Sequence, residues 1–450
     1  MQFELTREYI DDLRNLIDQE NATEAKAKIE ELHAVDIADI LDELNTEEAK
    51  YIFLLLDADT GADVLSEIEE DDRKRFIKIL PIEVIAKKFI DHMDSDDAAD
   101  LIGGLSEEKQ EEILSQIEDI ETAGDIVDLL HYDEDTAGGL MGKELVIVNE
   151  NWTVLTCLRE LSRQAEDIDE IYYVYVVDDD GKLIGTLSLK KMILSPTSAK
   201  IVNIYEPDVM SVHTDESDEE VSLIMEKYDL VALPVVDSIG RLMGRITIDD
   251  VVDVIRDEAE KDYQMASGIS EDIESNDSVW LQTRARLPWL LIGLVGGVFA
   301  AKVISLYEIG LDETPAMAFF IPLITAMAGN VGVQSSAIIV QGIASNSLGI
   351  ESTFSRLMRE LGGALINGLT CSSLLLLYNY FFSDSFALAI SVSVALFAVI
   401  IFAAIAGTLI PLMLHRAKID PALATGPFIT TLNDIVGLLI YLAIGVYFLT

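Results

Sequence analysis

Five long apolar segments in the second half of the chain constrain its fold more than any other feature. They cover about residues 287–307, 315–344, 358–382, 386–414 and 424–449. An α-helix of about 20 apolar residues crosses the hydrocarbon core of a bilayer, and each segment reaches that length. The sequence therefore predicts five membrane-spanning helices, with the lipid bilayer as a partner.

Charged residues beside these segments set the expected orientation. The basic ones precede the first and third segments and follow the fourth: Arg284, Arg286, Arg356, Arg359, His415, Arg416 and Lys418. The loops on the opposite side carry acidic residues instead: Glu308, Asp312, Glu313 and Asp384. Lys and Arg accumulate in cytoplasmic loops. We therefore expect a multi-pass protein of the plasma membrane with a cytoplasmic N-terminus and with Thr450 outside.

The last apolar segment contains a carboxylate, Asp434, about a third of the way along. An ionisable side chain at that depth costs roughly 2.5 kcal/mol or more, so it usually has a functional reason. The other acidic residues from Leu287 onward can be placed at a membrane edge or in a loop. Two interpretations stay open: Asp434 is a cation site on a transport path, or a protonated Asp434 forms a hydrogen bond between helices.

A run of small and amide residues interrupts the second segment: Gly329-Asn330-Val331-Gly332-Val333-Gln334-Ser335-Ser336-Ala337. Small residues let helices approach closely, whereas amides and freed carbonyls can line a water-filled path, so the run fits either role. Pro421, Gly426 and Pro427 disturb the start of the last segment in a similar way. Oxygen ligands without sulfur or imidazole suit a hard cation such as Mg²⁺, which binds one or two carboxylates and keeps much of its water.

The first 283 residues are strongly acidic, with 72 Asp and Glu against 24 Lys and Arg, while the remaining residues carry eight against seven. Proteins that bind nucleic acids or anionic lipids need positive charge at the contact. The acidic composition of these residues therefore argues against nucleic-acid binding. The natural partner of this part is a cation. The alternative is an acidic surface that serves solubility alone.

Residues 1–132 show helical spacing and an internal repeat. The sequence ADILDEL at 38–44 recurs as ADVLSEI at 62–68 and as ADLIGGL at 99–105. Short helices stacked into a small superhelix are expected from such a repeat. In each copy the Asp directly follows the Ala and lies off the apolar stripe, so it should face solvent or a partner.

Residues 133–248 show β-α alternation in two copies. The first copy has apolar strands at 171–178 and 183–189, and the second has them at 232–237 and 242–248, each pair around a tight turn. A strand, turn, strand and helix at this spacing resemble a tandem cystathionine-β-synthase (CBS) pair.

CBS pairs often bind adenosine nucleotides through a Thr or Ser and an Asp three residues further on, which hold the ribose. Thr247 and Asp250 match this pattern in the second copy, whereas the first copy has Ser188 followed by Lys191. The resemblance therefore implies that the second copy offers a site for ATP or another adenosine nucleotide.

Residues 249–283 are polar and strongly acidic. Their Val and Ile spacing is helical up to about Met265, after which Ser267 and Gly268 loosen it. This stretch must connect the soluble part to the first span, so we expect a connecting helix that transmits movement.

Together, these modules resemble the MgtE-type magnesium channels over essentially the full length. The most telling motifs are Gly329-Asn330-x-Gly332-x-Gln334-Ser335 and Pro421-Ala422-Leu423 followed by Thr431-Leu432-x-Asp434. The expected fold is a multi-domain membrane protein. Its parts are an all-α superhelical N-domain (1–132), an α/β tandem CBS pair (133–248), a connecting or plug helix with its linker (249–283) and a five-helix α transmembrane domain (284–450). Val333 and Gly426 depart from the family pattern, which often has Asn at both positions.

The resemblance implies a homodimer with its pore at the interface, Asp434 as the pore Mg²⁺ ligand, and closure of the pore by cytosolic Mg²⁺. By motif position, the implied regulatory ligands are Asp63, Asp96, Asp100, Glu219, Asp229, Asp250, Asp253 and Glu258, with Asp420 near the cytoplasmic mouth.

A passive, gated Mg²⁺ channel is the leading functional interpretation, and no Gly-x-x-x-x-Gly-Lys-Ser/Thr motif for ATP hydrolysis is present. An ion-coupled exchanger is a second interpretation, although it would be expected to need further buried charges. A membrane-tethered sensor of Mg²⁺ or nucleotide without transport is a third, but it leaves Asp434 without a role. An enzyme is least expected, because the five histidines are scattered and no nucleophile-base pair is evident.

Overall fold

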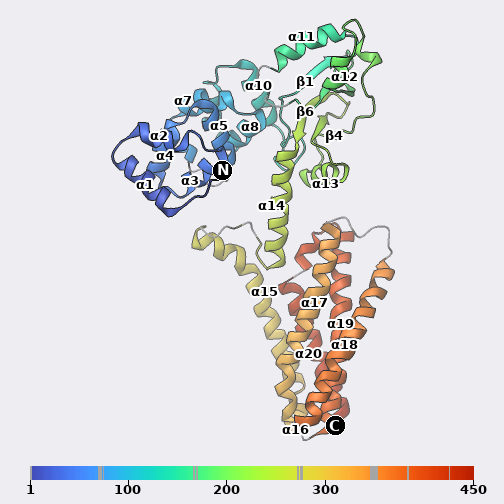
Figure 1. Ribbon diagram of the computed structural model, residues 1–450. Helices are drawn as coiled ribbons and strands as arrows, with labels where there is room; N and C mark the ends of the chain where they lie inside the picture. Colours follow the sequence, from blue (N-terminus) through green and yellow to red (C-terminus); the bar gives the residue numbers. More distant parts are fainter. Residues whose placement is uncertain are drawn as a thin grey trace. The chain divides into compact units, whose positions relative to one another are not determined.

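The computed structural model describes residues 3–68, 73, 76–165, 168, 171–270, 273, 277–344, 353–382, 385–424 and 426–449. These residues form two compact units, Met1–Ile255 and Arg256–Thr450 (Figure 1). Each unit is described separately below.

Short helices make up the first part of the N-terminal unit. They are α1 (Arg7–Asp18), α2 (Ala22–Ile29), α3 (Ala34–Asp42), α4 (Thr46–Leu55), α5 (Ala58–Glu67), α7 (Ile82–Val84), α8 (Ser95–Gly103), α9 (Glu107–Leu114) and α10 (Ile120–Leu129), with a π turn at Ile85–Phe89 and a 3₁₀ turn at Ile90–His92. Local capping sets several of the helix starts. In α4, the Asn45 side chain accepts a hydrogen bond from the Glu48 backbone N–H at 3.1 Å, and the Glu48 carboxylate accepts one from the Asn45 N–H.

The predicted repeat falls on α3, α5 and α8. Its alanines are all buried: Ala38, Ala62 and Ala99. The aspartates that follow them are all exposed: Asp39, Asp63 and Asp100. The prediction that these carboxylates lie off the apolar stripe is confirmed. The apolar faces of these helices share one core with the second β-α copy, to which Leu233, Val235 and Ile246 belong.

Two small sheets follow, one for each predicted β-α copy. The first contains β1 (Val146–Asn149), β2 (Val174–Val177) and β3 (Leu183–Leu187), and the second contains β4 (Val212–His213), β5 (Ala232–Val236) and β6 (Leu242–Thr247). In both sheets the first pair of strands is parallel and the second pair is antiparallel. The parallel strands are connected through α11 (Val154–Gln164) and α13 (Asp218–Tyr228), while α12 (Leu189–Leu194) follows β3.

The hairpin turns of the two sheets need glycine. Gly181 and Gly240 have φ of +80° and +86°, a region that side chains with a Cβ rarely adopt. The sequence predicted these two turns and the four hairpin strands. It did not reveal β1 and β4, which span four and two residues.

Helix α14 (Ile248–Ala266) continues directly from β6 and is the predicted connecting helix. Its last residue is one position beyond Met265, after which the sequence pattern loosens. The division between the two compact units falls within this helix, after Ile255.

The second unit contains the five predicted spans as helices of 23 to 31 residues. They are α15 (Val279–Leu306), α17 (Ile321–Ala344, preceded by a 3₁₀ turn at Pro315–Phe320), α18 (Thr353–Phe382), α19 (Phe386–Arg416) and α20 (Pro427–Leu449). A short helix, α16 (Glu308–Glu313), lies between the first two spans, and a 3₁₀ turn, η5 (Pro421–Ala424), precedes the last.

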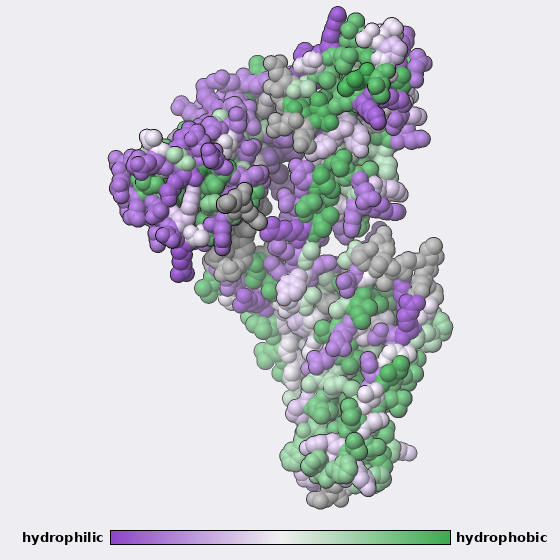
Figure 2. Space-filling model, in the orientation of Figure 1, coloured by the Kyte–Doolittle hydropathy of each residue, from purple (hydrophilic) through white to green (hydrophobic). Residues whose placement is uncertain are grey.

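Helix α19 is the most buried of the five spans and packs against α17, α18 and α20. In the view of Figure 2, the surface of the spans is largely hydrophobic (green). On α15, for example, Leu290, Leu294 and Val298 are each 64–66% exposed. Exposed apolar side chains of this kind suit a hydrocarbon environment, so the predicted multi-domain membrane fold is confirmed.

Candidate metal centres in the membrane helices and the acidic N-terminal unit

Asp434 lies in α20 and is half-buried. Among the residues that the structure describes, none donates a hydrogen bond to its carboxylate and none forms an ion pair with it. A Cβ built on Gly329 of α17 would lie 3.9 Å from the Asp434 Oδ1 atom. The carboxylate therefore lies beside α17 without a protein partner in the described chain.

The small residues of the α17 motif pack against α20. A Cβ on Gly329 would lie 3.1 Å from Thr430 Cγ2, and a Cβ on Gly332 would lie only 1.8 Å from Asn433 Nδ2. Both glycines are buried. This half of the motif serves close helix packing, one of the two roles that the sequence left open.

The amides of the same motif lie on another face of α17. Asn330 and Gln334 are exposed, as is Ala337, and their spacing of four and three residues places them on one side of the helix. This face offers amide oxygens and nitrogens near the level of Asp434 along α17. Amide oxygens of this kind can contact a hydrated divalent cation through its water molecules.

Gly426 contacts the end of α14 within the second unit. Its φ is +57°, and a Cβ there would lie 2.4 Å from the Ala266 carbonyl oxygen. Gly268, just after α14, would likewise bring a Cβ to 2.6 Å from Pro427 Cγ. Glycine at position 426 thus has a local reason, because a larger residue would push the end of α14 away from the start of α20.

Two predicted ligands of the second unit have simple surroundings. Asp420 is exposed, and its Oδ1 atom accepts a hydrogen bond from the Ala422 N–H at 2.7 Å, at the start of the turn before α20. Glu258 is half-buried in α14 and forms an ion pair with Lys261 at 2.9 Å. Neither is grouped with other carboxylates among the described residues.

Glu360 is a second acidic residue within a span, and the sequence analysis did not select it. It lies about two turns into α18, where its Oε1 atom accepts a hydrogen bond from the Ser335 hydroxyl of the α17 motif. Its position close to Arg356 and Arg359 allowed it to be assigned to a membrane edge. An isolated acidic residue two turns into an apolar helix was the available signal.

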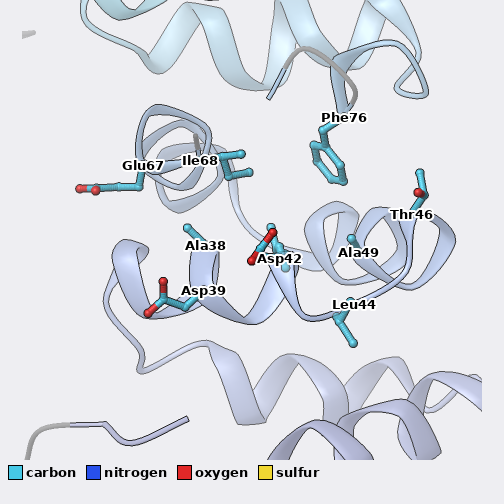
Figure 3. Close-up of a pocket in the computed structure, with 10 residues that line it drawn as sticks. Ala38, Asp39, Asp42, Leu44, Thr46, Ala49, Glu67, Ile68 and Phe76 are labelled. Carbon is cyan, nitrogen blue, oxygen red and sulfur yellow. The ribbon is translucent and has the colours of Figure 1, made fainter. Parts of the chain in front are cut away.

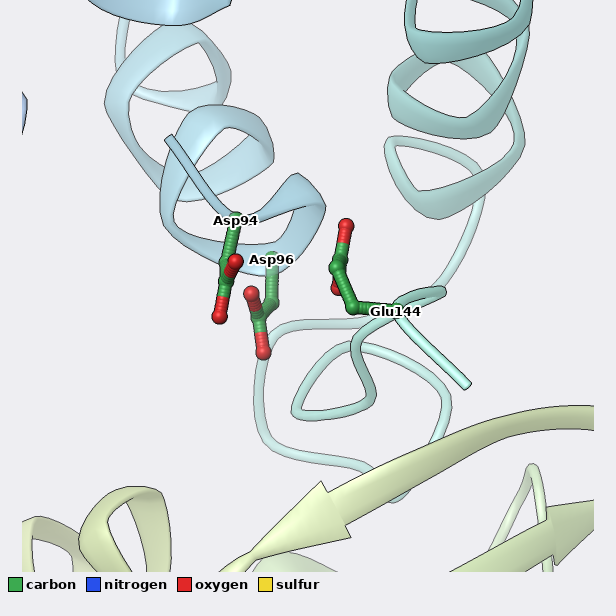
Figure 4. Close-up of side chains that lie close together, drawn as sticks. All are labelled: Asp94, Asp96 and Glu144. Carbon is green, nitrogen blue, oxygen red and sulfur yellow. The ribbon is translucent and has the colours of Figure 1, made fainter. Parts of the chain in front are cut away.

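Three carboxylates converge in the N-terminal unit. Asp94 and Asp96 lie at the start of α8, and Glu144 lies in the loop before β1 (Figure 4). One ligand oxygen from each lies within 4.8 Å of the others. The loop is fixed by two hydrogen bonds, from the Ser95 N–H to Glu144 Oε1 at 2.9 Å and from the Lys143 N–H to the Ser95 hydroxyl at 2.8 Å. We call Asp94, Asp96 and Glu144 the α8 carboxylate group.

Burial and the nearness of like charges both raise the pKa values of carboxylates at and near this group. Burial, followed by the charges of Asp250, Asp97, Glu144 and Asp94, raises the pKa of Asp96 well above its usual value. Burial also raises the pKa of Asp250 to about 7, with Asp249 and Asp97 adding to the shift and hydrogen bonds from Thr247 opposing it. A divalent cation at this position would offset the repulsion, and oxygen-only ligands fit Mg²⁺.

Of the predicted regulatory ligands, Asp96 and Asp250 are close enough for the charge of Asp250 to raise the pKa of Asp96. Asp63 and Asp253 lie further along the same acidic region, where burial and then the charge of Asp253, with smaller effects of Asp97 and Asp63, raise the pKa of Glu67. Three others are exposed and belong to no group of ligand atoms within the described residues: Asp100, Glu219 and Asp229. The sequence missed Asp94, Asp97 and Glu144, because only the packing of α8 against a distant loop brings them together.

The predicted nucleotide residues contact each other. The Thr247 hydroxyl donates to Asp250 Oδ2 at 2.6 Å, and the Thr247 N–H donates to the same oxygen at 3.1 Å. Nearby in the sequence, Arg245 is 7% exposed, and its guanidinium carbon lies 5.5 Å from the ring centre of Tyr172 in the first copy. The CBS pair therefore carries a hydroxyl and a carboxylate in its second copy, and a guanidinium of that copy lies beside an aromatic ring of the first.

A separate cavity of about 250 Å³ lies among α3, α4 and α5 (Figure 3). Its lining combines Leu41, Leu44 and Phe76 with the carboxylates of Asp39, Asp42 and Glu67. None of the predicted metal or nucleotide residues lines it.

Comparison with known proteins agrees with this organisation. The chain matches family models described as the MgtE intracellular N domain (residues 32–135), the CBS domain (137–195 and 201–257) and the MgtE divalent cation transporter (321–444).

Three relatives described as magnesium transporter MgtE match over most of their length. The protein from Bacillus subtilis is 33% identical over 79% of each chain, and that from Thermus thermophilus is 36% identical over 78% of each. The protein from Enterococcus faecalis is 37% identical over 73% of this chain and 72% of its own. A solved structure, the cytosolic domain of the Mg²⁺ channel MgtE in complex with ATP, is 35% identical with a TM-score of 0.50 and covers 54% of this chain and 99% of that one.

An acidic helical domain, a CBS pair and five apolar spans with an intramembrane carboxylate define a class, the CBS-containing divalent-cation transporters of membranes. Within that class, the chain belongs to the MgtE family of magnesium transporters. It is a membrane transporter and not an enzyme.

Proposed function

We propose that this protein is a homodimeric Mg²⁺-selective channel of the plasma membrane, gated by cytosolic Mg²⁺. The observation that carries the proposal is Asp434, a carboxylate in a membrane span to which the described chain supplies no hydrogen-bond donor or cation. An unpaired carboxylate at that depth is costly, and a permeating cation compensates it.

A second copy of the chain completes the pore in this proposal. Two Asp434 carboxylates would present a charge of −2 to a divalent ion. The exposed face of α17 with Asn330 and Gln334 is available to line the path or to meet the partner. One or two carboxylates with outer-sphere oxygens suit Mg²⁺, which gives up its water reluctantly.

The driving force for permeation is the membrane potential. Moving a divalent ion through 100 mV is worth roughly 4.6 kcal/mol, so flux into the cell needs no chemical energy source. This requires the orientation predicted from the basic loops, with a cytoplasmic N-terminus and Thr450 outside.

Regulation follows from the acidic N-terminal unit. In the proposed mechanism, Mg²⁺ binds at the α8 carboxylate group together with Asp250, and further ions bind near Asp63 and Asp253. Like charges crowd there in the absence of a cation. Several weak sites acting together favour the closed state only through their affinity difference between states, which gives a steep response.

Helix α14 carries this signal in the proposal, because Asp250 and Asp253 lie in its first turns and its end contacts α20. The contact consists of the Ala266 carbonyl oxygen against Gly426 and of Gly268 against Pro427. Glu258 in α14 and Asp420 before the turn η5 are further proposed ligands of the second unit. Asp100, Glu219 and Asp229 remain proposed ligands of weaker, exposed sites.

An adenosine nucleotide is a proposed second ligand of the CBS pair. In support of this, Thr247 and Asp250 are hydrogen-bonded to each other and both carry groups that can bind ribose hydroxyls, and Arg245 is a buried cation of the kind that binds phosphate. Because Asp250 is also a proposed Mg²⁺ ligand, nucleotide and Mg²⁺ binding should be coupled.

Mg²⁺ flux into proteoliposomes, with Mg²⁺ on the N-terminal side varied, tests this function. A channel of the proposed kind conducts at low internal Mg²⁺ and closes in the millimolar range, without a counter-ion gradient. A strict requirement for a Na⁺ or H⁺ gradient would establish the exchanger instead, and binding without flux would establish the sensor.

A further inference from the structure

Asn433, the residue before Asp434, has an unusual environment for an amide. It is 0% exposed. Its Oδ1 and Nδ2 atoms are both inaccessible to solvent, and neither has a hydrogen-bond partner in the described part of the chain. A buried amide without partners is unfavourable, so a membrane helix would normally carry an apolar residue there.

The place that Asn433 occupies is shaped by a glycine. A Cβ on Gly332 of α17 would lie 1.8 Å from Asn433 Nδ2 and 3.1 Å from its Cγ, so the amide fills the space that any other residue at 332 would need. The other side of Gly332 is closed by α19, because a Cβ on Gly407 would lie 2.5 Å from the Gly332 carbonyl oxygen. We call the space above Gly332 the Gly332 notch.

The notch lies one helical turn from the contact between Thr430 and Gly329, and Ile429 also reaches Gly332. Asp434 directly follows Asn433. A helix held by these contacts cannot turn about its axis without withdrawing Asn433 from the notch.

We infer that Asn433 is a positioning residue for Asp434. Its amide, inserted into the Gly332 notch, fixes the rotation of α20 and thereby the direction of the Asp434 carboxylate. This inference rests on the proposed role of Asp434 as the pore ligand.

The size of the effect follows from helix geometry. With side chains, an α-helix has a radius of roughly 5 to 6 Å, so a turn of 20° about its axis moves a side-chain end by roughly 2 Å. That displacement equals a Mg²⁺–oxygen distance, and Mg²⁺ tolerates little departure from its preferred coordination. Loss of the notch contact should therefore loosen the selection of Mg²⁺ over Ca²⁺ more than it affects folding.

A double-mutant cycle in the full-length protein tests this inference. Asn433→Ala empties the notch and Gly332→Ala fills it. The double variant relieves the overlap with the amide but keeps the contact with Ile429, whose Cγ2 atom lies 2.8 Å from a Cβ on Gly332. The readouts are the Mg²⁺ concentration for half-maximal flux in proteoliposomes and the Mg²⁺/Ca²⁺ flux ratio. Elution volume and thermal midpoint report folding of each variant.

Asn379→Ala is the matched control. Asn379 of α18 is 2% exposed and also has an amide nitrogen without a partner among the described residues. It lies on a different helix from Asp434, so its loss should leave both readouts within about twofold of the parent. Asp434→Asn is measured in parallel, so that the pore assignment is tested on its own.

We expect each single variant at the notch to weaken the apparent Mg²⁺ affinity or lower the Mg²⁺/Ca²⁺ ratio by about tenfold, and the double variant to recover part of the loss caused by Gly332→Ala, because the contact with Ile429 remains. Parental readouts for Asn433→Ala would overturn the inference. Failure of the double variant to recover, in folded protein, would also overturn it. If Asp434→Asn retains parental flux, the proposed pore function itself fails, whatever the notch variants do.

Discussion

Replacing Glu144 by Gln tests whether the α8 carboxylate group is a Mg²⁺ site. The substitution removes one charge but keeps the shape and the oxygen that accepts the Ser95 N–H. We expect two opposite effects, a more stable N-terminal unit without Mg²⁺ and a smaller gain of stability when Mg²⁺ is added.

The geometry sets the magnitude of the first effect. The Glu144 oxygen lies within 4.8 Å of oxygens of Asp94 and Asp96, and two like charges at that separation repel by about 3.5 kcal/mol at an effective dielectric of 20. Solvent weakens the repulsion from Asp94, which is exposed. The raised pKa of Asp96 favours its uncharged form, which weakens the repulsion from this residue as well. We therefore expect the substitution to stabilise the unit without Mg²⁺ by roughly 1 to 2 kcal/mol. For a unit of this size, that corresponds to a rise in midpoint of roughly 2 to 8 °C.

Mass action sets the second effect. A site with a millimolar dissociation constant contributes about 1.4 kcal/mol at a tenfold excess of Mg²⁺. The variant has lost a charged ligand and should gain clearly less than the parent does.

The assay is thermal unfolding of the full-length protein in detergent with and without Mg²⁺, followed by tryptophan fluorescence, with Trp152 reporting on the N-terminal unit. Glu112→Gln, an exposed change on α9, is the matched control and should alter neither midpoint. An unchanged Mg²⁺-induced shift in Glu144→Gln would refute the assignment of this group as a metal site.

Three further predictions concern pH, nucleotide and the α14–α20 contact. Because burial raises the pKa of Asp250 from 3.8 to about 7, its contribution to stability without Mg²⁺ is complete below about pH 4 and is lost as the pH rises through 7. Mg²⁺ competes with that proton, so the Mg²⁺-induced shift in the unfolding midpoint should be larger at pH 8 than at pH 6, and a shift independent of pH would contradict this. Thr247→Ala removes the hydroxyl that bonds to Asp250, and we expect ATP binding, measured by calorimetry, to weaken about tenfold while a control, Thr60→Ala at a half-buried residue of α5, leaves it unchanged. Gly426→Ala places a Cβ 2.4 Å from the Ala266 carbonyl oxygen at a positive φ, which costs about 1 kcal/mol or more. Flux in that variant should persist at Mg²⁺ concentrations that close the parent, and closure at the parental concentration would show that this contact does not transmit the signal.

The features that the sequence predicted are those encoded over short stretches of chain. Apolar length was enough to locate the five spans, because a bilayer sets one length for all of them. The helical repeat was also visible from local spacing, and its alanines, Ala38, Ala62 and Ala99, are buried in the core. The hairpin strands of the β-α copies were visible through β-branched runs around glycine turns, whereas β1 and β4 are too short to give such a pattern.

The features that the sequence did not predict depend on contacts between distant segments. Glu144 joins Asp94 and Asp96 only because a loop before β1 packs beside α8. Glu360 and Asn433 acquire their surroundings from α17, and no local pattern distinguishes Asn433 from an ordinary polar residue. The α17 motif was recognised, but its division into a packing face and an amide face required the helices to be placed.

The most direct test of the central claim is Mg²⁺ uptake by proteoliposomes containing the Asp434→Asn variant. The substitution removes the charge and keeps the size of the side chain, and it should not hinder insertion, because an amide is less costly than a carboxylate in the membrane. The account predicts that this variant assembles like the parent but takes up Mg²⁺ at no more than about a tenth of the parental rate, given that a lost charge–ion contact is worth well over 1.4 kcal/mol. Undiminished uptake by the correctly assembled variant would contradict the account.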